Sequence, residues 1–321
     1  MSRGKRIIPR NTQPVVGGGK VFLALGQRGV WALEEATGRR LWRRRLPGGA
    51  FSTPAFDESS QVLYALSGAG RVCRIDANTG RILTRVSLGG PRSKLPFPPA
   101  LLSDRILVSW GNYVFALRKG DLSVIWSYDA GSPVETPPAY SVARDVAVVV
   151  TQDLFVHAID NSSGTQRWRV KPIPRDGGDP AGSNSALAEA RFGWPVIAEQ
   201  HGYVLVKYRL DWQALWVWSP WPADNSTMRT NLAARPEYRA LFVLDLDDGS
   251  VPFEPNVGHG GFGDGDYLPM GPQPVVRTLP EGGEVAYVVM RGSPCASGAY
   301  CDGRADSHFG ELVLDDTTVP G

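Results

Sequence analysis

The feature that most constrains this chain is an eleven-residue segment that recurs at a fixed step of 42 residues. The first copy runs from Ala32 to Trp42 and reads as an alternating strand, a turn built on Thr-Gly, and a second strand that carries a tryptophan. Later copies begin at Arg74, Ala116 and Ala158, and a fifth begins at Val243, one further step plus 43 inserted residues downstream. A constant period of this length predicts stacked structural repeats, because a single repeat cannot bury its apolar face alone.

Two shorter apolar runs recur upstream of each copy and complete the repeat. A proline opens the first run at Pro14, Pro54, Pro99, Pro138, Pro195 and Pro274. The second run starts at Val21, Val62, Ile106, Val146, Val204 and Val285. Short apolar runs separated by Gly, Asn, Asp and Ser are typical of strands, and proline is tolerated at the first position of a strand. Each repeat is therefore predicted to contain four strands, named A to D in chain order.

Four antiparallel strands in a repeat of roughly 40 residues are the pattern of a propeller blade. We predict an all-β protein, a β-propeller with five complete four-stranded antiparallel blades and a sixth partial blade. Such a set of blades would leave unpaired sheet edges, which proteins avoid, so we expect the chain to be part of a larger propeller.

The turn between strands C and D has a recurring composition that predicts how neighbouring blades are held together. A glycine at this turn can adopt positive φ, and a preceding aspartate can accept backbone N–H groups. The tryptophan of strand D is expected to be buried between blades. The residues predicted to have these structural docking roles are Gly38, Gly80, Gly164, Asp76, Asp160, Trp42, Trp126 and Trp168.

The recurring pattern Ala-x-Asp-x-x-Thr-Gly-x-x-x-Trp resembles the docking motif of the PQQ-like (pyrroloquinoline quinone) repeat family. The resemblance covers residues 12–321, which defines a predicted propeller domain after an N-terminal tail of residues 1–11. It implies a propeller of about eight blades in the complete protein. The family includes quinoprotein dehydrogenases and a non-enzymatic outer-membrane assembly lipoprotein. In that family the motif residues hold blades together and do not touch substrate.

Composition argues against nucleic acid as a partner and against a transmembrane segment. The chain has 34 Lys and Arg against 32 Asp and Glu, a net charge of +2, so no strong field predicts nucleic-acid binding. No apolar run approaches the roughly 18 residues of a transmembrane segment. The first residues are basic but lead into no apolar core, so no signal peptide is visible.

Four insertions interrupt the repeats of blades 4 to 6, at residues 170–193, 208–239, 254–271 and 291–307. Strand parity places D-to-A and B-to-C connections on one face of a propeller, and all four insertions fall in such connections. Binding residues are commonly carried by loops on a rigid scaffold. We therefore predict that this face of blades 4 to 6 binds a ligand or partner. The alternative is that the loops only cover a partner domain or further blades.

Two of the insertions contain the candidate binding residues. The second is rich in tryptophan, which suits either an interaction patch or a small core of the loop itself. The third contains the letters G-x-G-x-x-G, but no helix follows, so a nucleotide site is not predicted. Its carboxylates suit either a Ca²⁺ ligand set or a flexible turn. The candidates are Trp212, Trp216, Trp218, Trp221, His259, Asp264 and Asp266.

The fourth insertion contains Cys295 and Cys301, which flank a short polar segment. They are either a local disulfide or two unrelated thiols. A disulfide would indicate an oxidising, extracytoplasmic compartment such as a bacterial periplasm or cell envelope. The third cysteine, Cys73, lies in an alternating strand and is expected to be buried.

The sequence offers no catalytic set. A quinoprotein site, as the resemblance implies it, would need a general-base aspartate, Ca²⁺ ligands and often an adjacent Cys-Cys pair, and no such pair occurs. PQQ and Ca²⁺ are therefore not supported by the residues, no metal site is assigned, and no catalytic residue is assigned. The leading hypothesis is a non-catalytic binding or scaffolding module with a protein or envelope component as partner. The alternatives are a PQQ-dependent oxidoreductase and a carbohydrate- or envelope-binding protein.

Overall fold

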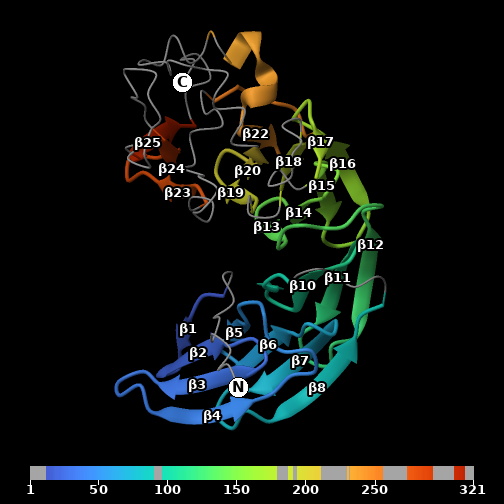
Figure 1. Cartoon of the computed structure of the whole chain (residues 1–321), viewed down its shortest axis with the longest axis vertical. Coiled ribbons are helices and arrows are strands. Elements are labelled where there is room, and N and C mark those ends of the chain that lie inside the picture. Colours follow the sequence, from blue (N-terminus) through green and yellow to red (C-terminus); the bar gives the residue numbers. More distant parts are fainter. Residues whose placement is uncertain are drawn as a thin grey trace, which may run out of the picture. The chain divides into compact units, whose positions relative to one another are not determined.

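In a computed structural model, the structure describes residues 12–89, 96–178, 187–190, 194–210, 230, 232–255, 273–291 and 307–314. These residues form short strands, helical residues at 230 and 232–234, and a short 3-10 turn at Pro236–Tyr238. The chain divides into two compact units, Met1–Pro138 and Ala139–Gly321. Figure 1 shows their strands in chain order.

The first unit contains blades 1 to 3, each a four-stranded antiparallel sheet whose strands pair in chain order. Blade 1 consists of β1 (Val15–Gly17), β2 (Lys20–Ala24), β3 (Val30–Glu34) and β4 (Arg40–Arg44). Blade 2 consists of β5 (Ala55–Asp57), β6 (Val62–Leu66), β7 (Arg71–Asp76) and β8 (Ile82–Ser87). Blade 3 consists of β9 (Ala100–Leu101), β10 (Arg105–Trp110), β11 (Tyr113–Arg118) and β12 (Val124–Asp129).

The second unit contains blades 4 to 6 and a small additional sheet. Blade 4 consists of β13 (Ala139–Ser141), β14 (Val146–Val150), β15 (Val156–Asp160) and β16 (Gln166–Val170). Blade 5 consists of β19 (Val196–Ala198), β20 (Tyr203–Lys207) and β22 (Leu241–Asp245). Blade 6 consists of β23 (Val275–Thr278), β24 (Glu284–Arg291) and β25 (Ser307–Val313). The additional sheet contains β17 (Asp176–Gly177), β18 (Leu187–Glu189) and β21 (Arg209–Leu210).

The predicted propeller fold is confirmed, with one local difference in blade 5. Its turn closes as in the other blades, through a bond from Asp245 N–H to the Ser250 carbonyl at 2.8 Å, but residues 251–255 form no strand. Pro252 and Pro255 remove two N–H donors from this segment, which weakens any ladder there. Phe253 instead packs edge-on against Tyr203, with ring centroids 6.3 Å apart.

The turns between strands C and D share one geometry. The glycine N–H donates to the carbonyl of the residue that ends strand C, at 2.8 Å from Gly80 to Asp76 and at 2.8 Å from Gly164 to Asp160. The φ angles of Gly38, Gly80 and Gly164 are 70°, 70° and 74°, where a side chain would be strained. The Asp76 carboxylate accepts the Thr79 N–H at 2.7 Å, and this bond is the first cause of its lowered pKa.

The docking tryptophans lie at equivalent positions of their blades. Trp42, Trp126 and Trp168 stand opposite Ala32, Ala116 and Ala158 in the strand register. Their exposed fractions are 8%, 7% and 7%, so the prediction that they are buried is confirmed. The Trp42 indole N–H donates to the Ala77 carbonyl of blade 2 at 2.9 Å, and the Trp168 indole N–H donates to the Leu246 carbonyl of blade 5 at 2.9 Å. These contacts join blade 1 to blade 2 and blade 4 to blade 5.

Carboxylates provide a second connection between neighbouring blades. Glu58 of blade 2 accepts the Gly18 N–H of blade 1 at 3.1 Å. Glu199 of blade 5 accepts the Ala143 N–H of blade 4 at 2.7 Å. Glu284 of blade 6 accepts the His201 N–H and the His201 Nδ1 of blade 5, at 3.0 and 2.8 Å. Each carboxylate binds the A-to-B turn of the preceding blade.

Candidate binding face formed by the inserted loops

The predicted site residues lie outside the described residues. This holds for Trp212, Trp216, Trp218, Trp221, His259, Asp264 and Asp266, and for the disulfide candidates Cys295 and Cys301. Their proposed roles therefore stay predictions. Cys73, in contrast, is described, and its thiol is free and buried, with a pKa raised by burial to about 11.

The described parts of the first two insertions pair with one another. Strand β18, from insertion 170–193, runs antiparallel to β21, from insertion 208–239, with Ala188 opposite Leu210 and Glu189 opposite Arg209. Strand β17 lies parallel to β18 on its other side. We name this sheet, with the loop segments that contact it, the inserted-loop platform. Two connections that strand parity places on one face of adjacent blades therefore meet in a single structure.

Tyr208 anchors the platform to blade 4. Its hydroxyl donates to the Leu154 carbonyl in the B-to-C turn at 2.8 Å, and its ring meets Phe242 edge-on at 5.7 Å. Its exposed fraction is 1%, and burial raises its pKa well above the usual value. Gly177 approaches the same turn so closely that a Cβ atom would lie 1.8 Å from the Gln152 carbonyl oxygen. The platform is thus packed on the scaffold and is positioned by it.

Charged side chains connect three of the four insertions. The guanidinium Nε of Arg175, in the first insertion, donates to the Glu237 carbonyl in the second. Arg239, in the second, forms an ion pair with Glu254, the first residue of the third, at 2.7 Å. Arg175 and Arg239 are 9% and 5% exposed, so these guanidinium groups lie inside the platform and not on its surface.

A second set of charges lies where the platform meets blade 5. Glu189 of β18 is 5% exposed and accepts a bond from Arg209 of β21 at 3.3 Å. Lys207, at the end of β20, is fully buried. Ammonium and guanidinium groups are rarely buried unless they are paired, so these residues fix the conformation of the loops that surround them. These buried charges hold the inserted-loop platform in one conformation.

Among the described residues, no group of three or more His, Cys, Asp or Glu side chains could hold a metal ion.

His157 lies beside the turn on which the platform packs. It is 1% exposed, and its Nε2 lies 3.3 Å from the Thr151 hydroxyl. Burial, together with the nearby Arg169 charge, lowers its pKa to about 4. The ring is therefore neutral in the folded protein at pH 7.

This shift predicts a pH dependence of stability. Between pH 6.5 and about 4 the unfolded chain binds a proton at His157 that the folded chain does not, so stability is lost as the pH falls. The full window corresponds to about 3 kcal/mol. We expect denaturant unfolding at pH 7 and pH 4.5 to show a smaller difference for His157→Gln than for the wild type. Equal differences would contradict a neutral, buried His157, because all carboxylate contributions are common to both proteins.

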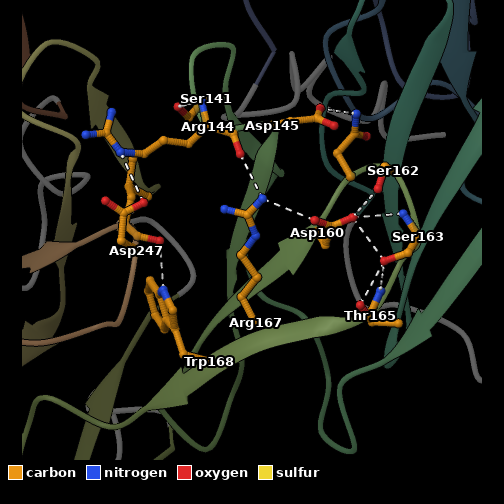
Figure 2. A network of polar contacts seen from close by, with 12 residues as sticks. Ser141, Arg144, Asp145, Asp160, Ser162, Ser163, Thr165, Arg167, Trp168 and Asp247 are labelled. Atoms are coloured by element: carbon orange, nitrogen blue, oxygen red, sulfur yellow. Dashed lines mark hydrogen bonds and ion pairs between the residues drawn. The ribbon is translucent and has the colours of Figure 1, made fainter.

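Figure 2 shows the polar network at the C-to-D turn of blade 4, which lies at the other end of strand β15 from the B-to-C turn on which the platform packs. Arg167 donates to the Arg144 carbonyl at 2.9 Å and to the Asp160 carboxylate at 3.1 Å. Arg144 lies 3.5 Å from the Asp247 carboxylate of blade 5. Hydrogen bonds, the Ser162 hydroxyl first, hold the pKa of Asp160 below its usual range. This network stabilises the contact between blades 4 and 5 and involves none of the platform residues named above.

Sequence reasoning missed the residues that build the platform: Arg175, Glu189, Lys207, Tyr208, Arg209 and Arg239. One signal was present, since Lys207 directly continues the apolar run Val204–Val206 and strand pairing extends over it. A lysine inside a buried strand needs a polar partner, which indicates a polar contact beyond the strand end.

The comparisons with known proteins agree with this architecture. A family model described as "Outer membrane protein assembly factor BamB" matches residues 5–83 and 55–209. A curated relative, tetrathionate hydrolase of Acidithiobacillus ferrooxidans, is 26% identical over 98 residues, which are 30% of this chain and 19% of the relative. The chain therefore matches only about a fifth of that protein's length.

Three solved structures are similar in fold. BamB from Moraxella catarrhalis aligns with a TM-score of 0.57 at 15% identity, over 88% of this chain and 73% of that one. The computationally designed Ika8 protein aligns with a TM-score of 0.55 at 11% identity, over 92% and 73%. Quinohemoprotein alcohol dehydrogenase from Comamonas testosteroni aligns with a TM-score of 0.53 at 14% identity, over 88% and 52%. At these identities the similarity shows the fold alone.

Within the part of the chain that the structure describes, no helix has both the length and the apolar character needed to span a bilayer. The family model covers more than half of the chain, and the residues it matches contain blades 1 to 4 and the first two strands of blade 5. The chain therefore belongs to the PQQ-like repeat β-propeller family whose model is described as outer membrane protein assembly factor BamB.

Proposed function

We propose that this chain is a non-catalytic binding or scaffolding propeller whose binding face is formed by the inserted loops of blades 4 to 6. The observation that carries the proposal is the joining of three insertions through the β18–β21 pairing, the Arg175–Glu237 contact and the Arg239–Glu254 ion pair. Loops that served only as padding would have no need of buried charges to fix their positions relative to one another.

The partner that this face suits is a protein or another component of the cell envelope, and the proposed location is extracytoplasmic. The family description names an outer-membrane assembly factor, which supports both parts of the proposal. Such a surface gains affinity by pre-organisation, because little conformational entropy is lost when a rigid platform binds. The tryptophans of the second insertion would supply large apolar contacts of the kind that dominate binding energy at interfaces.

A PQQ-dependent oxidoreductase is the alternative that the family leaves open. A quinohemoprotein dehydrogenase shares the fold, but the sequence shows no adjacent cysteine pair and offers no ligand set for the cofactor. Adding PQQ and Ca²⁺ to the purified chain and recording the absorption spectrum tests this alternative directly. A saturable spectral change at stoichiometric PQQ would favour the oxidoreductase over the scaffold.

We expect a variant that lacks residues 211–229 to lose partner binding while its propeller stays folded. The deletion removes four of the ten tryptophans and leaves the buried Leu232 in place. Immobilised wild-type and variant chains would be incubated with detergent-solubilised envelope from the source cells, and bound proteins quantified by mass spectrometry. The proposal predicts a defined set of proteins that falls at least about tenfold for the variant, as loss of a binding hot spot would cause.

Val142→Ser is the matched control, since Val142 is 75% exposed on the A-to-B turn of blade 4, at the far end of strand β14 from the platform. This variant should bind the same proteins as the wild type. Circular dichroism and the unfolding midpoint of the deletion variant would show whether the propeller is intact. Unchanged binding by a folded deletion variant would remove the inserted loops from the binding face.

A further inference from the structure

The last strand of blade 1 concentrates positive charge at the edge of its sheet. Five of the seven residues from Arg39 to Arg45 are arginine, and none is acidic. Four of these arginines are exposed; the fifth, Arg44, is half-buried and donates to the Gly80 carbonyl of blade 2 at 2.6 Å. The whole chain has a net charge of only +2, so this charge is a local feature.

Strand β8 of blade 2 continues this basic surface. Residues 81–88 contain Arg81 and Arg85, both exposed, and no acidic residue. The bond from Arg44 to the Gly80 carbonyl places the end of β4 beside the start of this segment. Arg85 stands opposite Cys73, whose side chain belongs to the core shared by blades 1 and 2. We call the exposed arginines of both strands the arginine patch: Arg39, Arg40, Arg43, Arg45, Arg81 and Arg85.

The patch arginines have little to neutralise them in the part of the chain that the structure describes. There, Arg39 alone of the patch forms an ion pair, with Glu34 at 3.4 Å, and the two side chains are 68% and 36% exposed, so the pair is weak. The Arg40 guanidinium carbon lies 5.1 Å from the centroid of the Trp31 ring, a contact that leaves its charge in place. Neighbouring like charges repel one another and destabilise the folded state, so an anionic partner would stabilise it.

The last strands of blades 3 and 4 show that this charge is not a general requirement of the fold. In blade 4 the arginines are neutralised, because Arg167 pairs with Asp160 and Arg169 pairs with Asp153, each at 3.1 Å. In blade 3, strand β12 contains no lysine or arginine, although Val124 at its start is 52% exposed. Charged side chains on an edge strand commonly prevent pairing with another chain. Since β12 lacks such cations, edge protection does not account for five arginines around β4.

We propose that the arginine patch binds the surface of an anionic phospholipid bilayer. The guanidinium group donates hydrogen bonds in a fixed fork that matches phosphate oxygens, and each added cation strengthens attraction to an anionic lipid surface. Leu41, 37% exposed among the arginines, and the half-buried Trp31 ring beside Arg40 fit the boundary between headgroups and acyl chains better than a fully solvated polyanion. The proposal does not rest on the inserted-loop platform, which belongs to the second unit.

The test is sedimentation of the full chain with vesicles of equimolar phosphatidylglycerol and phosphatidylcholine. We expect binding to these vesicles, weakened by added salt because exposed charges are screened, and no binding to vesicles of phosphatidylcholine alone. Arg43→Gln/Arg45→Gln should bind at least about tenfold more weakly, since each arginine contributes about fivefold. Its match is Arg118→Gln/Arg277→Gln, which removes the same charge from exposed residues of blades 3 and 6 and should bind like the wild type.

Competitors and a stability control complete the test. Both double variants should keep the unfolding midpoint of the wild type, and the arms that vary lipid and salt need only the wild type, so they decide the question even if a variant unfolds. Failure to bind the anionic vesicles, equal binding to neutral vesicles, or equal weakening by the two double variants would overturn the proposal. Release from the vesicles by polyglutamate, duplex DNA or inorganic phosphate, at a charge concentration below that of the lipid, would also overturn it and assign the patch to that soluble anion.

Discussion

Replacing Trp168 by alanine is expected to lower the free energy of unfolding of the second unit by about 3–5 kcal/mol. The side chain is 7% exposed and packs in the core that joins blades 4 and 5. Its removal leaves a cavity next to Gly249 and leaves the Leu246 carbonyl without its 2.9 Å bond. Both losses fall on the contact between blades 4 and 5. Denaturant titration of the purified protein measures the change.

Trp168→Phe separates the two contributions. The phenyl ring retains much of the packing but donates no hydrogen bond, so this variant should lose about 1–2 kcal/mol. Arg43→Ala, on the exposed outer strand of blade 1, is a surface control that should change stability by less than about 0.5 kcal/mol. A Trp168→Ala protein as stable as that control would contradict the docking role of the tryptophan.

The parts of the fold that follow from local chemistry were predictable. The turn requires positive φ, which Gly38, Gly80 and Gly164 supply, and strand register places Trp42, Trp126 and Trp168 ten residues after the start of their segments. Both features recur at the repeat period, so a copy that departs from the pattern can still be recognised from its spacing to the other copies. Even Leu122, which breaks the glycine pattern, keeps the left-handed backbone that the turn imposes.

The other parts of the fold depend on contacts between residues that do not recur at the repeat period, so they were not predicted from the sequence. Strands β17, β18 and β21 contain two or three residues each, too few for an alternation to be read. The carboxylates that join the blades follow strand A in two cases, Glu58 and Glu199, but begin strand B in the third, Glu284. Their common role is defined by the amide groups they reach in space. The missing outer strand of blade 5 was visible only in part, through its two prolines.

The same reasoning explains why the candidate site was predicted as a face and not as a set of residues. Strand parity depends only on the number of strands between two connections, so it predicts a shared face for the insertions and says nothing of the contacts within them. Within them, Arg175 and Arg239 are ordinary surface residues by composition. Only the packing of one insertion on another buries them, and no pattern in the sequence encodes that packing.

A second large effect is expected at the contact between blades 2 and 3, for Lys119→Met. The Lys119 ammonium lies 2.5 Å from the Asp57 carboxylate, and the two side chains are 18% and 7% exposed. Burial disfavours the charged form of Asp57, but hydrogen bonds from Lys119 and Ser59 outweigh it and hold the pKa of Asp57 below its usual range. Removing the cation leaves a buried carboxylate unpaired, which costs about 3–5 kcal/mol.

The pH dependence of this loss distinguishes an ion pair from simple packing. In the wild type, the stability that Asp57 contributes is present above the unfolded pKa of about 4 and declines as the pH falls below it. In Lys119→Met the folded pKa rises instead, so protonation of Asp57 relieves the buried charge. The difference between the two proteins should therefore narrow from pH 7 to pH 3, and the double variant Asp57→Asn/Lys119→Met should recover part of the lost stability at pH 7. A difference in stability that stays constant with pH would show that Lys119 does not act through Asp57. Its effect would then come from the packing of its aliphatic chain and from its hydrogen bond to the Ser103 carbonyl, 3.1 Å away.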